Sequence, residues 1–297
     1  MIAHWISAFR LRTLPLALSS IGMAGFLAAV ENKFNGLVFT LCCLTTVFLQ
    51  ILSNLANDYG DTIHGADHSG RSGPSRAVQS GTISAHSMRN AIILFVVLCL
   101  ASGVALLLAA FGYDYRLLGS FLVLGLLCIA AAIMYTVGRK PYGYAGLGDL
   151  SVLIFFGGVG VSGALFLFTK TLTPISFLPA LACGLFAVGV LNINNMRDIE
   201  SDRQAGKFSV PVRIGKVKAG LYHWFLLLGG LLATTAYTVL NYTSPIQFLF
   251  MLSAPVFVSI GRGVNEKPSE QLDPYLKRMA LGTLLFVILF GVGQLMA

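Results

Sequence analysis

Residues 36–61 read GLVFTLCCLTTVFLQILSNLANDYGD, and this stretch decides the fold class of the chain. Its first 18 residues are almost wholly apolar, which approaches the ~20 residues that an α-helix needs to cross ~30 Å of hydrocarbon. Acidic residues follow at once, because Asp58 and Asp61 end the stretch and Asp67 lies shortly after it. The sequence therefore predicts a membrane helix that ends in carboxylates, and such an end requires a chemical explanation.

The rest of the chain has the same apolar character. Of its 297 residues, 56% are hydrophobic and 11% are charged, whereas the charged share of a soluble domain is about 25%. Windows of ~20 residues predict nine spans, near residues 13–31, 36–57, 90–111, 116–137, 147–168, 175–196, 219–240, 244–262 and 278–296. We therefore expect one all-α integral membrane domain over residues 1–297. No A-x-A cleavage pattern follows the first span, so we expect it to be a retained helix.

Basic residues predict the orientation of these spans. Of the 20 Lys and Arg residues, 17 fall in loops on the side of the N-terminus, which indicates a cytoplasmic N-terminus and an inner-membrane protein. This bias also accounts for the net charge of +8, so we expect contact with lipid headgroups and no nucleic-acid partner. Ten of the 12 acidic residues lie on the same side, all but Glu31 and Asp114, although the orientation rule does not require this of acids.

A second acidic helix end matches the first. Residues 192–207, NINNMRDIESDRQAGK, end the sixth span, and Asn194-x-x-x-Asp198 repeats the spacing of Asn54-x-x-x-Asp58. The two lie four helices apart, so two units of four helices would have the same orientation in the membrane. We expect parallel repeats near 10–140 and 141–262, followed by a ninth helix at 278–296. The two acidic ends would then face each other across a cavity that opens to the cytoplasm.

Each acidic end carries a stripe of oxygen ligands. At helical spacing, each of two trios shares one face: Asn54, Asp58 and Asp61 in the first, and Asn194, Asp198 and Asp202 in the second. Like charges ~5 Å apart repel by ~3 kcal/mol at an effective dielectric of 20, so four gathered carboxylates need a counter-charge. Carboxylate oxygens suit Mg²⁺, which uses one or two carboxylates together with substrate phosphates. The pattern predicts a site for a metal-bound diphosphate.

The intervening loops supply cations and a third polar segment. GRSGPSRAVQSG carries Arg71 and Arg76, and the second acidic end carries Arg197, Arg203 and Lys207; such cations can bind phosphate or lipid headgroups. YTVGRKPYGYAGLGD, residues 135–149, joins the fourth and fifth spans through a compact turn. Its Asp149 is either a helix cap or a group that handles an acidic hydroxyl of a substrate.

The cysteines and loop histidines give weaker signals. All five cysteines lie inside predicted spans without C-x-x-C spacing, which is typical of packing residues and not of a disulfide framework or a zinc site. His64 and His68 are four positions apart in a predicted loop. We interpret them as ordinary polar loop residues and not as zinc ligands.

Five segments together resemble a known family. NDYGD, GPSRAVQSG, YTVGRKPYGYAGLGD, NNMRDIESDRQAGK and VPVRIG are similar, in this order, to motifs of the UbiA superfamily of intramembrane aromatic prenyltransferases. They resemble most its 1,4-dihydroxy-2-naphthoate polyprenyltransferase branch, which forms demethylmenaquinone. The ring prenyltransferases of the ubiquinone type usually place a third acid four residues after the second, whereas here Asp67 follows Asp61 by six.

The resemblance implies a fold, a cofactor and a reaction. The fold is nine transmembrane helices around a central cavity, and the reaction is Mg²⁺-dependent transfer of a polyprenyl group from its diphosphate to 1,4-dihydroxy-2-naphthoate, with loss of CO₂. The implied metal ligands are Asp58, Asp61, Asp198 and Asp202. The implied substrate-binding residues are Asn54, Asn57, Arg71, Arg76, Arg139, Lys140, Asn194, Arg197 and Lys207. Asp149 and Tyr135 are the implied catalytic residues, the first toward a ring hydroxyl and the second toward the allylic cation.

Other functions remain open at this point. Another member of the superfamily, such as a 4-hydroxybenzoate or haem-modifying prenyltransferase, would share the same motifs. A secondary transporter also uses parallel repeats, but almost no ionisable residue lies at mid-span here. A CDP-alcohol phosphotransferase would carry a longer D-G-x-x-A-R motif, which this sequence lacks.

Overall fold

The computed structural model describes residues 2–65 and 76–297. Among these residues, nine helical segments are long and apolar enough to cross a membrane, which confirms the nine predicted spans. They are Ile2–Val30, Gly36–Ile63, Ala85–Phe111, Tyr115–Met134, Gly148–Thr169, Pro174–Arg197, Val210–Leu240, Pro245–Glu266 and Asp273–Leu295. The family resemblance thus predicted the correct all-α architecture.

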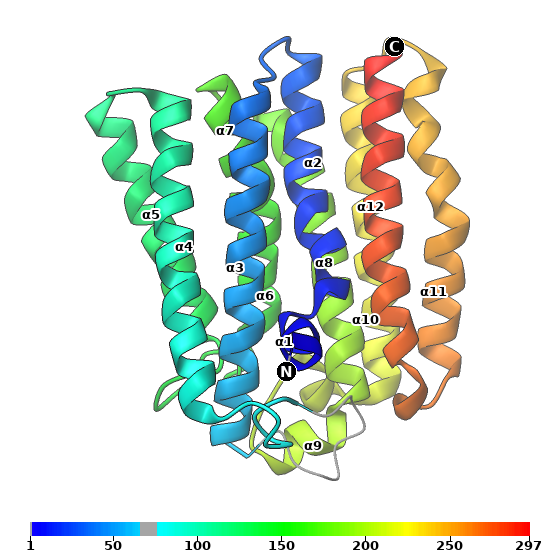
Figure 1. Cartoon of the computed structure of the whole chain (residues 1–297). Helices are drawn as coiled ribbons and strands as arrows, with labels where there is room; N and C mark the ends of the chain where they lie inside the picture. The colour runs from blue at the N-terminus through cyan, green and yellow to red at the C-terminus, as the bar shows by residue number, and fades with distance from the viewer. Residues whose placement is uncertain (1, 66–75) are drawn as a thin grey trace.

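Several spans consist of more than one helix (Figure 1). The elements in chain order are α1 (Ile2–Phe9), η1 (Leu11–Thr13), α2 (Leu14–Val30), α3 (Gly36–Ile63), α4 (Ala85–Phe111), α5 (Tyr115–Met134), α6 (Gly148–Val152), η2 (Leu153–Gly163), α7 (Ala164–Thr169), η3 (Pro174–Ser176), α8 (Phe177–Arg197), α9 (Ile199–Gln204), α10 (Val210–Leu240), η4 (Pro245–Ser253), α11 (Ala254–Glu266), η5 (Ser269–Gln271) and α12 (Asp273–Leu295). Segment η2 is π-helical, and such segments are frequently found at functional sites.

Local sequence explains where the helices begin and bend. The side chains of Asn35, Ser84 and Asp114 accept hydrogen bonds from the first backbone amides of α3, α4 and α5. Asp114 is therefore a helix cap, which accounts for one of the two acids outside the acidic loops. The first span breaks at Arg10, whose φ of 48° is left-handed, and α10 bends at Gly215, whose φ is 78°.

Packing is dense on one side of the bundle and loose on the other. The fully buried rings of Phe186, Phe257 and Phe286 join α8, α11 and α12, with the first two stacked at a centroid distance of 4.5 Å. In contrast, Ile129 is the one buried residue of α5, which lies beside α4 at one edge of the bundle (Figure 1). Since α5 is apolar and exposed, it is a lipid-facing helix.

The acidic motifs lie at one end of the bundle, which we call the acidic end. Helices α3 and α8 both finish there, next to α9 and the N-terminus, whereas the C-terminus lies at the opposite, far end (Figure 1). The two motifs, far apart in sequence, are thereby brought to the same place.

Candidate active site

Two hollows meet at the acidic end. A cavity of about 420 Å³ runs between the helices, and a polar pocket of about 50 Å³ lies against the two acidic motifs. Six residues line both of them: Arg10, Asn57, Arg76, Tyr135, Leu191 and Asn194. A polar chamber for charge therefore adjoins an apolar chamber within one site.

Three aspartates face the polar pocket. Asp61 comes from α3, Asp198 follows α8, and Asp202 lies in α9, and all three side chains are buried. Lys207 lies between the motifs, with its Nζ 3.9 Å from an oxygen of Asp61 and 3.5 Å from an oxygen of Asp202. The structure thus brings the two acidic helix ends together, with a lysine as the bridging charge.

Lys207 is held in its charged form by this setting. Burial acts to lower the pKa of its ammonium group, but the charges of Asp61 and Asp202 more than offset this, so the pKa lies above its ordinary value. Tyr144 completes the contact, because its hydroxyl donates to Asp61 at 2.9 Å and its ring lies 5.6 Å from the lysine nitrogen. A permanent positive charge therefore lies where diphosphate oxygens would be stabilised.

Asp198 is held by a second cation. Arg197 donates to both of its carboxylate oxygens, from Nε at 2.9 Å and from Nη2 at 2.7 Å, and the same guanidinium donates to Asn194 at 3.0 Å. Its remaining nitrogen pairs with Asp273 at the start of α12, and Arg12 of η1 pairs with the other oxygen of Asp273 at 2.9 Å. This network ties the second motif to α12 and to the N-terminal segment.

The network makes Asp273 a positioning residue whose loss should be measurable. We expect Asp273→Asn to lower kcat/KM for the prenyl diphosphate about tenfold, because a hydrogen bond to a buried charged group contributes about 1.5–3 kcal/mol. Arg197 would keep Asp198 but lose its own anchor, so the effect should appear in KM more than in the Mg²⁺ requirement. Steady-state kinetics in detergent measure this, with Asp114→Asn at the far end as the matched control. Equal kinetics in both variants would contradict the role of Asp273.

Asn54 and Asp58 point away from the polar pocket. The two oxygens of Asp58 accept hydrogen bonds from the backbone amides of Ala77 and Val78, each at 3.1 Å. The amide of Asn54 donates to the carbonyl oxygen of Phe9 and to the hydroxyl of Thr13. Asn54 therefore lines the large cavity and not the polar pocket. The predicted stripe of Asn54, Asp58 and Asp61 is therefore divided by the loop that folds back onto α3.

Asn57 and Asp61 are the residues of the first motif that face the polar pocket. Their spacing of four matches that of Asn194 and Asp198, which face the same pocket from the other side. The pair Asn57 and Asp61 therefore corresponds in space to Asn194 and Asp198. The spacing within the sequence alone pairs Asn54 and Asp58 with them instead. Gly60 allows α3 to lie close to Thr136, since a Cβ there would lie 2.6 Å from the carbonyl oxygen of Thr136.

Of the predicted site residues in segment 135–149, only Tyr135 lines the two hollows. Tyr135 lines both hollows, but Arg139 and Lys140 are exposed and line neither of them. The carboxylate of Asp149 accepts a hydrogen bond from Tyr222 of α10 at 3.3 Å, and this residue also lies outside the lining of the two hollows. Arg71 and Asp67 lie outside the described residues.

Burial governs the phenol of Tyr135. It raises the pKa above the ordinary value; the charge of Lys207 opposes this, and the charges of Asp61, Asp149 and Asp202 add to it. Tyr135 therefore remains protonated. Its position depends on Gly148, because a Cβ there would lie 2.7 Å from the phenol oxygen.

The sequence interpretation missed several residues of the site. Arg10 lines both hollows, Tyr144 binds Asp61, and Asp273 anchors Arg197. The hydroxyl of Tyr142 donates to the carbonyl oxygen of Ala131 at 2.9 Å and lies 3.0 Å from the hydroxyl of Ser151. The two missed tyrosines lie within the quoted YGYAGLGD segment, so their alternation there was the available signal.

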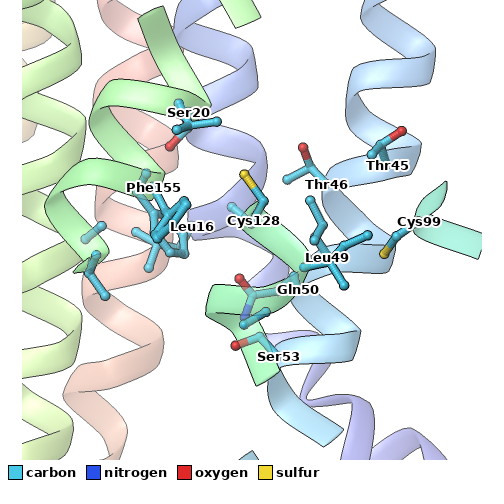
Figure 2. Close-up of a pocket in the computed structure, with 18 of the residues that line it drawn as sticks. Leu16, Ser20, Thr45, Thr46, Leu49, Gln50, Ser53, Cys99, Cys128 and Phe155 are labelled. Atoms are coloured by element: carbon cyan, nitrogen blue, oxygen red, sulfur yellow. The ribbon is translucent and has the colours of Figure 1, made fainter. Parts of the chain in front are cut away.

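The large cavity is lined mostly by apolar side chains, with a few polar ones such as Ser20, Thr45 and Thr46 along its length (Figure 2). Gln50 and Ser53 of α3 line it near Asn54, while Leu16, Leu49 and Phe155 line it together with Cys99 and Cys128 (Figure 2). Figure 2 shows α3 on one side of the cavity and Phe155 of η2 with Leu16 of α2 on the other. A substrate with a charged group in the polar pocket and a long apolar part fits such a cavity.

The donor set fits a divalent cation that arrives with its anion. Among residues 2–65 and 76–297, no three His, Cys, Asp or Glu side chains converge closely enough to hold a metal by themselves. The carboxylates of Asp61 and Asp202 are instead bridged by Lys207, with the amides of Asn57 and Asn194 beside them. Because Mg²⁺ keeps several waters and takes only one or two carboxylates besides phosphate oxygens, these residues fit Mg²⁺ bound together with a diphosphate.

Relatives of known name share nearly the whole chain. It is 46% identical to 1,4-dihydroxy-2-naphthoate octaprenyltransferase of Escherichia coli, over 97% of this chain and 94% of that protein. It is 33% identical to the protein of the same name from Mycobacterium tuberculosis, over 96% of this chain and 94% of that protein.

Solved structures share the fold. A UbiA homolog from Aeropyrum pernix, in its apo form, gives a TM-score of 0.66 at 19% identity, covering 97% of this chain and 98% of that chain. A UbiA homolog from Archaeoglobus fulgidus bound to GPP and Mg²⁺ gives 0.60 at 15% identity, covering 96% and 100%. The family model of the UbiA prenyltransferases matches residues 18–282. With this match and the identities above, the chain, which has nine helical segments among residues 2–65 and 76–297 that are long and apolar enough to cross a membrane, belongs to the UbiA prenyltransferase family.

Proposed function

We propose that this chain transfers a polyprenyl group from polyprenyl diphosphate to 1,4-dihydroxy-2-naphthoate. The products are the quinol form of demethylmenaquinone, CO₂ and diphosphate, so the reaction belongs to menaquinone biosynthesis. One observation carries the proposal: a pocket of buried aspartates and cations shares six lining residues with a large apolar cavity. The names of the relatives at 46% and 33% identity support the acceptor.

The polar pocket binds the diphosphate end of the donor in this proposal. Arg10, Arg76 and Lys207 line it together with three aspartates, so its side-chain charges balance. A diphosphate that carries a divalent cation adds little net charge to such a pocket and therefore meets little repulsion. Asp61 and Asp202 are the proposed metal ligands, with Asn57 and Asn194 beside them, while both oxygens of Asp198 accept hydrogen bonds from Arg197.

The proposed role of Asp58 differs from that of the other aspartates. Its oxygens hold the backbone amides of Ala77 and Val78. Arg76, the preceding residue, lines the pocket. Asp58 would therefore position Arg76 toward the diphosphate through the loop.

Bond breaking follows from the charges around the leaving group. The chemistry that Mg²⁺ supplies when bound is positive charge against the diphosphate oxygens. Lys207 and Arg76 add fixed charge there, so the allylic C–O bond can ionise while the apolar cavity excludes water. The π-face of Tyr135, at the junction of the two hollows, stabilises the allylic cation.

The acceptor ring lies between the two chambers in this proposal. Gln50, Ser53 and Ser151 provide polar contacts at the acidic end of the cavity, where a ring with hydroxyl and carboxylate groups can be oriented. A ring carbon then attacks the allylic carbon, and the carboxylate leaves as CO₂. Asp149 would act on this site only indirectly, since its carboxylate accepts a hydrogen bond from Tyr222 outside the cavity.

Orientation completes the proposal. The excess of Lys and Arg on the side of the N-terminus, 17 of 20, supports a cytoplasmic acidic end in the inner membrane. The polar substrates would then enter from the cytoplasm, and the product tail would remain in the bilayer.

A competition assay tests the acceptor. Purified protein in detergent receives a short prenyl diphosphate, Mg²⁺, and equal amounts of 1,4-dihydroxy-2-naphthoate and 4-hydroxybenzoate, and the products are identified by mass. We expect the prenylated, decarboxylated naphthalene product to predominate. Prenylated 4-hydroxybenzoate as the main product would instead support the ring prenyltransferases of the ubiquinone type.

A further inference from the structure

We propose that Gly103 of α4 and Gly125 of α5 set the length of the prenyl tail that the cavity accepts. The inference rests on the proposed function and adds a specificity determinant to it. Neither residue belongs to the acidic motifs, and both lie in the apolar part of the cavity wall.

Both glycines border open space. Each of them lines the large cavity, and a Cβ added to either would meet no atom within 4 Å. Cys99 and Cys128 share their helix faces, at spacings of four and three, and both are among the lining side chains drawn in Figure 2. The missing side chains therefore widen the cavity itself.

The depth of the glycines matches a long tail and not a short one. At 1.5 Å per residue, Asn54 lies about 27 Å from the far end of α3, whereas Gly125 and Gly103 lie about 15 Å and 12 Å from the far ends of their helices. The glycines are thus about 12–15 Å deeper than Asn54. An extended geranyl group is about 9 Å long, so it ends before this level, while longer tails must pass it.

Aromatic rings lie toward the far end of the cavity. Phe121, which lines the cavity, stacks on Phe166 of α7 at a centroid distance of 5.4 Å and meets Phe111 of α4 edge-on at 5.0 Å. A tail that runs straight from the acidic end toward the far end therefore meets these rings. It can use the width beside Gly103 and Gly125, where the walls are apolar and suit an isoprenoid.

Leucine at these positions tests the inference. Gly125→Leu and Gly103→Leu are assayed with geranyl diphosphate and with octaprenyl diphosphate, each with 1,4-dihydroxy-2-naphthoate. We expect turnover of the short donor to stay within about twofold of the unchanged chain, because the added side chain meets open space. Turnover of the long donor should fall by about tenfold or more, because the added volume occupies the space of its later isoprene units.

Gly119→Leu is the matched control on the same helix. A Cβ at Gly119 also meets nothing within 4 Å, but the residue is exposed and lies outside the cavity lining. It should leave both donors unaffected, and melting temperatures in detergent confirm that all variants fold.

Two results would overturn the inference: unchanged use of octaprenyl diphosphate in both cavity variants, or equal losses for both donors. An unchanged chain that is inactive with both donors would contradict the proposed function first, and the inference with it.

Discussion

Asp61→Asn and Asp202→Asn are each expected to lower prenyl transfer by about 100- to 1,000-fold, since both remove a charge that acts on the reacting diphosphate. The two residues come from different acidic motifs and share the ammonium group of Lys207, at 3.9 and 3.5 Å. An asparagine preserves the shape of the side chain but cannot balance Lys207 or hold a divalent cation as well. Turnover at saturating donor and a Mg²⁺ titration measure the loss.

Glu200→Gln is the matched control for this pair. Glu200 lies in α9 with Asp202, but its side chain is 73% exposed and pairs with Arg203 on the surface. We expect its removal to change turnover by less than about twofold. Equal losses in all three variants would indicate a general electrostatic effect and would contradict a specific acidic site.

Asp58→Asn tests whether Asp58 is a metal ligand or a residue that anchors the loop. Asp58 binds the amides of Ala77 and Val78, so its loss should impair donor binding without abolishing turnover at saturating substrate. A loss in turnover larger than that of Asp61→Asn would indicate that Asp58 is a metal ligand.

Lys207→Met is expected to lower turnover by about 100-fold and, unusually, to strengthen binding of Mg²⁺ alone. The ammonium group attracts the carboxylate of Asp202 by about 5 kcal/mol at 3.5 Å and an effective dielectric of 20. Without it, the buried carboxylates lose their internal counter-charge and bind an external cation more tightly. The diphosphate, however, loses a fixed positive charge as it departs.

Two measurements distinguish these effects. The Mg²⁺-dependent shift in melting temperature, without substrate, should increase in Lys207→Met, while product formation should fall. Lys218→Met, which removes an exposed charge from α10, is the control and should leave both readouts unchanged. A variant that keeps full turnover would contradict the role of Lys207 at the diphosphate.

The sequence predicted the spans well because each is set by a local property. A run of about 20 apolar residues is sufficient to identify a membrane helix, and all nine windows lie where helices are found. The ends were less accurate, since α3 continues to Ile63 and α10 starts at Val210, beyond the apolar windows. Helices that extend past the hydrocarbon are stabilised by contacts with loops, which hydropathy does not measure.

The sequence could not decide which acid of the first motif faces the pocket. Asp58 and Asp61 are three residues apart, so both fit one helical stripe. The choice depends on the backbone amides of Ala77 and Val78, which lie about 20 positions further along the chain. Such a contact is set by the tertiary fold and leaves no local pattern.

Long-range partners explain the other differences. The sequence leaves Asp149 either as a helix cap or as a group that acts on a substrate hydroxyl, and Tyr222 of α10, 73 positions away, binds its carboxylate. Arg197, a predicted substrate-binding residue, lines the large cavity and also holds Asp198 with help from Asp273, 76 positions away. The sequence indicated which residues are polar within an apolar chain, and the packing of α10 and α12 decides where they point.

The most direct test of a single site built from both acidic motifs is the Mg²⁺ dependence of product formation. Purified protein is given geranyl diphosphate and 1,4-dihydroxy-2-naphthoate in EDTA, and Mg²⁺ is then added in excess while product and released diphosphate are measured. We predict no product in EDTA and recovery with Mg²⁺. Asp61→Asn and Asp202→Asn should each prevent the recovery. Product formation that persists in EDTA, or a variant of either motif that recovers fully, would contradict the proposed site.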